Sequence, residues 1–286
     1  MKTASAFAAA LVLLAAGCGG GTSAYETPAT TAAPPAPAPG TTATVPAEQT
    51  SFRVYFVRGE RLGVAGRSVA KTQAVAAAAL AALLAGPTAA ERGDAGLGSE
   101  IPPDTRLLGV AVADGVATVN LSRTFESGGG SLSMQLRVAQ VVFTLTQFPT
   151  VDRVRFQLDG AAAPAIGGEG VVVDPAVGRA DFEAQAPAIL VESPVPLERV
   201  SSPLRIRGSA NVFEATFSAV LADASGAKLA EQVVTATSGT GERGTFDAEL
   251  SFDALGPGRL VLTVFALSAK DGSRQDVVEI PLELAP

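Results

Sequence analysis

Seven short apolar runs, separated by turn residues, follow one another near the end of this chain, where helical periodicity is absent. Along the third run, apolar residues alternate with polar ones, so we expect Phe213, Ala215, Phe217, Ala219 and Leu221 on the inner face of a strand. Short strands at this spacing predict an all-β, immunoglobulin-like sandwich over residues 187–286. The runs are AILVE, LRIRG, VFEATFSAVLAD, AKLAEQVVTAT, GTFDAELSF, RLVLTVFALS and DVVEIPLEL.

The region before it, residues 51–182, mixes the two periodicities. FRVYFV and RVRFQLDG read as strands, and LLGVAVADGVATVNLS reads as a hairpin turning at Asp114-Gly115. KTQAVAAAALAALLAGP predicts a helix with Ala76, Leu80, Leu83 and Leu84 on one face, ended by Gly86-Pro87. SLSMQLRVAQVVFTLTQFP contains valines that favour a strand, but its length without a turn signal favours a helix, which we predict. The order β-α-β-β-α-β predicts an α+β domain with helices on a small sheet.

The N-terminus has the form of an export signal. Lys2 precedes an apolar run over 6–16, which is shorter than the ~20 residues of a membrane-spanning helix. Ala16-Gly17-Cys18 resembles a bacterial lipoprotein signal, in which cleavage before the cysteine makes it the lipid-modified N-terminus. Ala15 departs from that pattern, which usually has leucine there. We therefore expect residues 1–17 to be a signal peptide and Cys18 to carry the lipid. An ordinary secretory signal with an incidental cysteine is the alternative.

Residues 18–50 are rich in Gly, Thr, Ala and Pro. Such a segment offers few bulky apolar groups to offset chain entropy, so we expect a disordered tether. The tether would connect the lipid to the folded domains.

Composition excludes several kinds of chemistry. The chain has no histidine and one cysteine, which rules out His-dependent catalytic triads, an internal disulfide and cysteine-based zinc sites. Its 21 Lys and Arg against 28 Asp and Glu give a net charge of −7, which argues against nucleic acid as a partner. We therefore assign no catalytic, cofactor-binding or metal-binding residues.

Three short motifs imitate functional sites. GTGERG at 239–244 fits a dinucleotide-binding pattern, but a strand-like run follows it, so we predict a glycine-rich hairpin loop. SVAK at 68–71 fits Ser-x-x-Lys, but the companion motifs are missing; we read Ser68 as a residue near a helix start and Lys71 as a solvated side chain. Asn120-Leu121-Ser122 fits a glycosylation sequon on an expected strand.

Several phrases resemble known bacterial domains. YFV, ALLAGP, SEIPPDTRLLGVAVADGVATVNLS, VVFTLTQFPTVDRVRFQLDG and GRADF, spread over residues 52–182, resemble the GerMN domain of sporulation and germination lipoproteins. SPLRIRGSANVFEATFSAVLADASG, GTFDAELSF and FALSAKDGS resemble the immunoglobulin-like domain of bacterial spore germination. The resemblance implies a role in envelope assembly or protein contact and no enzymatic activity.

We therefore expect a non-catalytic lipoprotein, anchored on the extracytoplasmic face of the cell membrane through acyl chains (palmitate) at Cys18. It would act as a protein-binding scaffold in envelope or spore assembly, with unidentified envelope proteins as partners, and self-association through strand edges is a further expectation. Two alternatives stay open: a solute- or glycan-binding module, marked by a pocket lined with phenylalanine, and a carboxylate-dependent cell-wall hydrolase.

Overall fold

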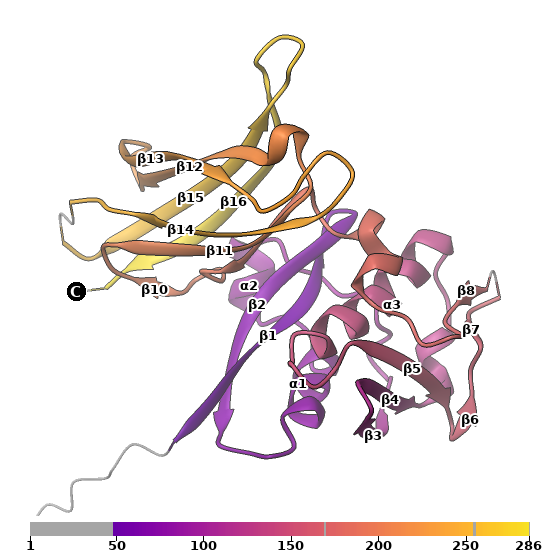
Figure 1. Cartoon of the computed structure of the whole chain (residues 1–286). Coiled ribbons are helices and arrows are strands. Elements are labelled where there is room, and N and C mark those ends of the chain that lie inside the picture. Colours follow the sequence, from indigo (N-terminus) through magenta and orange to yellow (C-terminus); the bar gives the residue numbers. More distant parts are fainter. Residues whose placement is uncertain (1–47, 169, 254–255, 286) are drawn as a thin grey trace, which may run out of the picture. The chain divides into compact units, whose positions relative to one another are not determined.

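A twisted two-stranded hairpin begins the folded part of the chain, in a computed structural model that describes residues 48–168, 170–253 and 256–285 (Figure 1). Strand β1 (Gln49–Arg58) pairs along its whole length with β2 (Arg61–Ala70), from Gln49 opposite Ala70 to Arg58 opposite Arg61. The sequence predicted a strand over 52–57 only. Strand β2 is additional, and β1 includes the last two residues assigned to the tether. Expectations about residues 1–47, including Cys18, lie outside the described residues.

Polar side chains from the α3 region (helix α3, Ser131–Leu145) satisfy the edge of β1 that faces away from β2. The Gln147 amide accepts from the N–H of Arg53 at 2.7 Å and donates to its carbonyl at 2.6 Å. The Thr144 hydroxyl accepts from the N–H of Tyr55 at 3.1 Å, and the Gln140 amide donates to its carbonyl at 3.3 Å. A buried backbone N–H or C=O without a partner costs folding free energy. These side chains therefore supply the hydrogen bonds that a neighbouring third strand would otherwise make.

The two predicted helices are present with shorter bounds. Helix α1 (Val75–Leu84) buries Leu80 and Leu83, and Gly86 follows it with a left-handed φ of 77°, as expected of a helix terminator. Helix α3 confirms the choice of helix for its valine-containing segment. A short helix α2 (Ala89–Asp94), begun by a capping box between Thr88 and Glu91, was not predicted because six residues are too few to show a period.

The remaining strands of this region form a four-stranded sheet in the order β3-β4-β5-β6. The hairpin of β3 (Leu107–Ala113) and β4 (Val116–Leu121) turns at Asp114 (φ 50°) and Gly115 (φ 76°), as predicted. Strand β5 (Arg153–Leu158) runs parallel to β4 after α3 crosses over, and β6 (Ala161–Ala162) closes the sheet. The shorter elements of this region lie outside that sheet: η1 (Arg123–Glu126), the separate two-stranded pair of β7 (Ala165–Ile166) and β8 (Val171–Val172), and η2 (Arg179–Gln185). The α+β class is confirmed, but β1 lies in a ribbon of its own and the predicted element order lacked β2.

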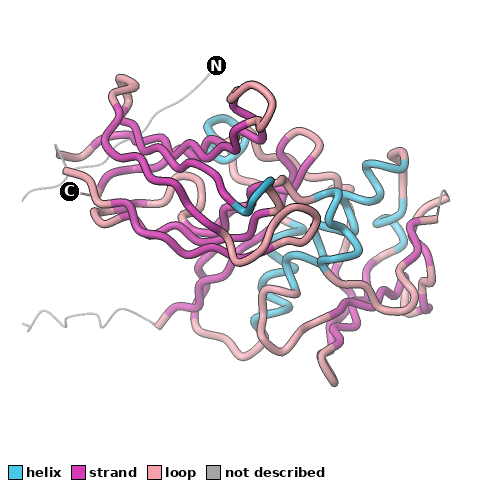
Figure 2. The backbone as a smooth tube through the Cα atoms, turned by 45° about the horizontal axis from the view of Figure 1, so that its top comes forward, coloured by secondary structure: helices cyan, strands magenta, loops and turns pink. Residues whose placement is uncertain are grey.

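The C-terminal region is all β, as predicted, and each of the seven predicted strands is present (Figure 2). One sheet has the order β10-β16-β15-β12-β13, and the other has the order β14-β11-β9. The bounds are β9 (Ile189–Ser193), β10 (Arg199–Val200), β11 (Leu204–Ala210), β12 (Thr216–Asp223), β13 (Lys228–Thr235), β14 (Gly244–Leu250), β15 (Gly258–Leu267) and β16 (Arg274–Leu284). Only the two-residue β10 was not predicted.

Two local expectations in this region were wrong. Phe213 is 56% exposed, because the chain forms the short turn η3 (Phe213–Ala215) with positive φ at Glu214 and Ala215 before β12 begins. The GTGERG segment connects β13 to β14, which belong to different sheets, so it is a crossover loop and not a hairpin. Phe217, Ala219 and Leu221 are buried as predicted.

Each region has its own hydrophobic core, and β9 contributes to both. Ile189 and Val191 pack in the core of the sandwich, whereas Leu190 packs in the core of the α+β region. Because side chains alternate across a strand, the next residue on the side of Leu190 is Glu192. Strand β9 thus carries a carboxylate toward the β1–β2 hairpin.

Candidate functional site

Glu192 meets a tyrosine and an arginine in a polar cluster at the junction of the two regions. Its Oε1 accepts from the phenol of Tyr55 on β1 and lies 2.7 Å from Nη1 of Arg179 on η2. Tyr55 is fully buried, and the Glu192 side chain is 16% exposed. Residues from β1, η2 and β9 are therefore held together by charge-assisted hydrogen bonds.

Arg179 is the centre of this cluster. Its guanidinium lies over the rings of Tyr55 and Phe143, at 5.2 and 4.8 Å from their centroids. It also donates to the Tyr55 phenol at 3.0 Å and to the Thr146 hydroxyl at 3.0 Å. The motif GRADF at 178–182 places this arginine, so the phrase that carried the family resemblance has a structural role.

The charges of this cluster are fixed at neutral pH. Burial on its own would raise the pKa of Glu192, but the charge of Arg179, the Tyr55 hydroxyl and Arg53 together hold it below the ordinary value. Burial raises the pKa of Tyr55 well above its ordinary range, against the opposing charge of Arg179. Burial acts to lower the pKa of Arg179, and its two partners raise it above the ordinary value. These groups are held in single protonation states and are poorly suited to proton transfer.

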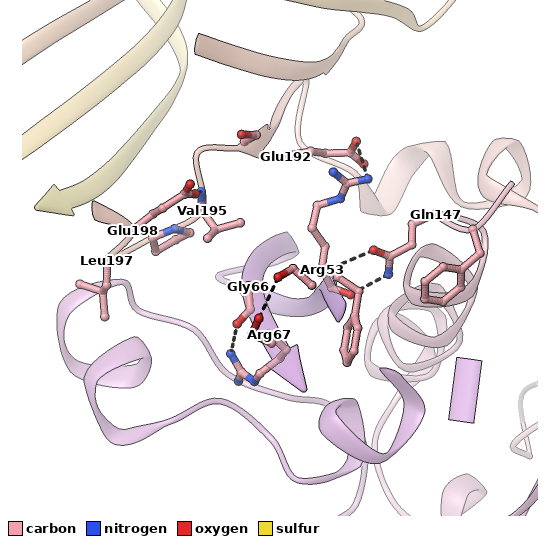
Figure 3. Close-up of a pocket in the computed structure, with 14 residues that line it drawn as sticks. Arg53, Gly66, Arg67, Gln147, Glu192, Val195, Leu197 and Glu198 are labelled. Carbon is pink, nitrogen blue, oxygen red and sulfur yellow. Dashed lines mark hydrogen bonds and ion pairs between the residues drawn. The ribbon is translucent and has the colours of Figure 1, made fainter. Parts of the chain in front are cut away.

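A pocket of about 640 Å³ opens beside the cluster (Figure 3). Ser51, Arg53, Gly66 and Ser68 of the hairpin line it, and Gly66 allows close approach, since a Cβ there would lie 2.8 Å from Cγ2 of Val195. Phe52 and Arg67 of the hairpin line it as well. The other lining residues follow α3, end β9 or come from the segment after β9: Gln147, Phe148, Glu192, Ser193, Val195, Pro196, Leu197 and Glu198. The surface mixes apolar groups, hydroxyls and both signs of charge.

Arg53 is the pocket's incompletely satisfied group. Gln147 bonds its backbone, but its guanidinium donates no hydrogen bond to any residue that the structure describes. Its Nε is buried without a partner, and Nη2 lies 3.8 Å from Oε2 of Glu192, too far for a hydrogen bond. The side chain is 34% exposed. The structure therefore leaves several donors of Arg53 available at the pocket.

The other charged groups of the pocket have partners. Arg67 forms a two-pronged ion pair with Glu91 of α2. Glu198 accepts the N–H of Val195 at 2.8 Å and is otherwise exposed. The hydroxyls of Ser51 and Ser68 lie 2.8 Å apart and bond to each other, so neither is activated as a nucleophile by a neighbouring base.

The imitative motifs do not form sites. Ser68 lies in β2 and not at a helix start, because α1 begins only at Val75; Lys71 is exposed, as expected, and pairs with Glu48. Asn120 is on β4, as expected, and accepts the N–H of Gly160. Across 48–168, 170–253 and 256–285, no group of three or more acidic or cysteine side chains is arranged to hold a metal ion. None of the helices within those ranges is long and apolar enough to cross a membrane.

The residues that matter at this junction were missed by sequence reasoning. Tyr55 and Arg179 appeared only as letters in the family phrases, and Glu192 appeared only as the end of a strand. Arg53 was taken for an ordinary residue of a strand. The one available signal was the two-residue period of β9, which puts Glu192 on the side opposite Val191.

Comparisons with known families agree with this architecture. Residues 53–163 match the Germane family model, described as sporulation and spore germination. Residues 188–273 match the Gmad2 model, the immunoglobulin-like domain of bacterial spore germination. The two resemblances seen in the sequence are thus confirmed, in the expected order. No curated protein matches the chain.

Solved structures give weaker likenesses. The first GerMN domain of the sporulation protein GerM from Bacillus subtilis is 24% identical, with 46% of this chain and 98% of that chain covered and a TM-score of 0.39. Its tandem GerMN domains are 18% identical over 71% of this chain and 61% of that chain, at 0.40. A "putative lipoprotein" from Clostridium perfringens is 20% identical over 48% and 93%, at 0.35. At these scores the likenesses carry no argument about function.

Proposed function

Because the chain carries a Germane domain followed by an immunoglobulin-like domain of bacterial spore germination, we propose that it is a non-catalytic, lipid-anchored envelope protein that binds other proteins. It would serve as a scaffold or accessory in spore or envelope assembly. The observation that carries the proposal is the open pocket at the junction, where chain segments from both regions present mixed polar and apolar groups. Such surfaces suit a polypeptide ligand.

The protonation states support a non-catalytic role. A general acid or base needs a pKa near the working pH, whereas Glu192, Tyr55 and Arg179 have pKa values displaced away from neutrality. Their bonds instead join β1 and η2 to the first strand of the sandwich. We interpret the cluster as a rigid support for the binding surface.

Photo-crosslinking in the native cell tests the binding role. A photoreactive residue at Ser68, which is exposed in the pocket, should capture a defined envelope protein. The matched control places it at Ser225, in the exposed turn between β12 and β13. Capture of the same set of proteins from both positions, or of none from Ser68, would argue against a binding surface at the pocket.

The anchor is tested at Cys18. The thioether-linked lipid proposed there would hold the protein at the extracytoplasmic face of the membrane, and more than one acyl chain is needed for stable anchoring. Cys18→Ala should release the protein into the medium or leave it unprocessed. A variant that stays membrane-bound at mature size would refute the anchor.

A solute- or glycan-binding role is the second candidate, because Phe52 and Phe148 line the pocket. Phe52 is only 6% exposed, which leaves Phe148 as the ring able to cover a sugar. Thermal-shift measurements with soluble cell-wall glycans would favour this candidate if they stabilise the protein. Release of soluble fragments from peptidoglycan would instead revive the hydrolase alternative.

Self-association has a specific candidate edge in β3. This strand, LLGVAVA, is an edge strand without a charged residue, and Leu108 and Val112 are 46% and 41% exposed. The long edge strand β13, by comparison, carries Lys228 and Glu231. Charges discourage pairing between exposed edges, so β3 is the edge that we propose to pair with its own copy.

The hairpin geometry sets the register of that pair. Ala113 and Val116 flank a two-residue turn and are hydrogen-bonded to each other, so the backbone groups of Val110 and Val112 face outward. Antiparallel pairing about a twofold axis at Ala111 would bond Val110 to Val112 of the other copy. Val112→Lys should then abolish concentration-dependent association in sedimentation, and Val277→Lys, at an exposed side chain of β16, should not. A wild-type protein that stays monomeric at about 1 mM would refute the pairing.

A further inference from the structure

We propose that the pocket at the junction binds a carboxylate carried by a polypeptide, with Arg53 as its principal ligand. The inference rests on the proposed protein-binding function and names the chemistry of the partner. Arg53 has five N–H donors, none of which donates a hydrogen bond to a described residue; its Nη2 forms only a long ion pair with Glu192 at 3.8 Å, and its Nε is buried. A planar guanidinium whose N–H groups lack acceptors can donate two parallel hydrogen bonds to the two oxygens of a carboxylate.

Glu192 does not fill that role. Its Oε1 already receives the Tyr55 hydroxyl and Arg179, and only Oε2 approaches Arg53, at 3.8 Å. Two arginines therefore share one carboxylate, and the nearer one satisfies it. The group around Glu192 has one positive charge in excess, on the side chain that reaches the pocket.

The other polar groups favour a polypeptide over a free anion. Ser51 and Ser68, whose hydroxyls now bond only to each other, can turn to donate to a bound carboxylate. Glu198 presents an exposed carboxylate from another wall of the pocket (Figure 3). A simple anion would be repelled by Glu198. An acidic residue in an extended peptide supplies both a carboxylate for Arg53 and backbone N–H groups for Glu198.

The apolar lining selects the neighbours of that acidic residue. Phe148, Val195 and Leu197 are half-buried around the opening, so each retains surface that a ligand can cover. In an extended peptide, side chains alternate between two sides, so the residues two positions before and after the acidic one point the same way as its carboxylate and can lie on this surface. The expected partner segment is therefore a short extended stretch with aliphatic residues two positions before and after an Asp or Glu.

Binding of short peptides to the full chain tests the inference. The probe is an N-acetylated, C-amidated Val-Ala-Asp-Ala-Val peptide, and its matched control has Asn in place of Asp. We expect the Asp peptide to bind at least ~10-fold more tightly than the Asn peptide in calorimetric titrations. Arg53→Met should remove that difference. Arg61→Met, which changes an exposed arginine of the same hairpin, should leave it unchanged.

A second measurement does not depend on the variants. In the wild-type protein, the NMR resonance of the Arg53 Nε–H should shift when the Asp peptide binds and not when the Asn peptide is added. Equal affinity for the two peptides, no binding by ~10 mM, or an unmoved resonance would overturn the proposal. Acetate and inorganic phosphate are added as separate arms; if either binds as tightly as the peptide, the site recognises a free anion and the polypeptide inference is wrong.

The crosslinking experiment distinguishes a failure of the proposed protein binding from a failure of the carboxylate inference. If Ser68 still captures an envelope protein while the peptides fail, protein binding stands and the carboxylate inference falls. If Ser68 captures nothing, the proposed function falls, whereas selective binding of the Asp peptide would still establish the subsite.

Discussion

Tyr55→Phe tests whether the cluster at Glu192 joins the two regions energetically. The substitution removes one hydroxyl, which donates to Glu192 and accepts from Arg179 at 3.0 Å, and it leaves the ring beside Phe143 at 5.5 Å between centroids. Each hydrogen bond to a charged group contributes about 1.5–3 kcal/mol. Because Arg179 still contacts Glu192 directly at 2.7 Å, part of this loss is recovered. We expect the free energy of unfolding to fall by about 2–3 kcal/mol.

Urea unfolding followed by far-UV circular dichroism measures this change. Tyrosine fluorescence is unsuitable, because the chain has no tryptophan and only two tyrosines, of which Tyr55 is one. The matched experiment is a double-mutant cycle with Glu192→Gln, which should give a coupling energy of about 1–2 kcal/mol. A loss below about 0.5 kcal/mol for Tyr55→Phe, or strictly additive effects, would refute the reasoning.

Three further predictions concern stability. The pKa of Glu192 is lowered on folding, so its contribution is complete above the ordinary carboxyl pKa and is lost as pH falls through the lower folded value; Glu192→Gln should flatten the acid limb of the urea midpoint against pH and cost about 3–5 kcal/mol at pH 7. Gln140→Leu leaves the buried carbonyl of Tyr55 without its donor and should cost about 2–4 kcal/mol in the same assay, with an unchanged midpoint as the contradicting result. Gly208→Ala places a Cβ 2.0 Å from a backbone oxygen of β9 and should cost about 3 kcal/mol or more, whereas Gly109→Ala, in open space, should change stability by less than about 0.5 kcal/mol; equal effects would contradict this account.

Structural features that are determined by a few adjacent residues could be predicted from the sequence. The turn at Asp114-Gly115 and the helix end at Gly86 each depend on a few adjacent residues whose backbone preferences are strong. The buried face of β5 follows from strict alternation, with Val154, Phe156 and Leu158 inside. Such signals do not depend on what lies elsewhere in the fold.

Strand β2 lacked such a signal. Its sequence, RLGVAGRSVA, contains two glycines, and residues 62–65 are all buried because both faces of the hairpin are covered there. Alternation disappears when both faces of a strand are covered. The expectation for Phe213 failed for the opposite reason: alternation was extended into a turn with positive φ at Glu214 and Ala215.

The junction cluster was beyond local reasoning. Tyr55 and Glu192 are 137 residues apart in the chain, and Arg179 belongs to a third element. Each looks ordinary in its own segment, and only the packing of β9 against the hairpin brings the three side chains together. The unsatisfied guanidinium of Arg53 likewise exists only because its nearest carboxylate is committed elsewhere.

The side chains of Gln140, Thr144 and Gln147 connect two elements that differ in rise per residue, the helix α3 and the strand β1. The four residues from Gln140 to Thr144 advance about 6 Å along the helix, yet both side chains bond to one residue, Tyr55. Gln147, just after the helix, bonds to Arg53, which lies two residues, or about 6.8 Å, further along the strand. The short threonine bonds to the strand in the middle, and the longer glutamines bond to it at both ends. Such a ladder can satisfy only a few strand positions, and beyond it, at Ser51, the hairpin opens into the pocket. A single-residue insertion between Gln140 and Thr144 would rotate the following side chains by about 100° around the helix axis and leave backbone groups of β1 without partners. The length of this helix segment is therefore fixed by the strand beside it.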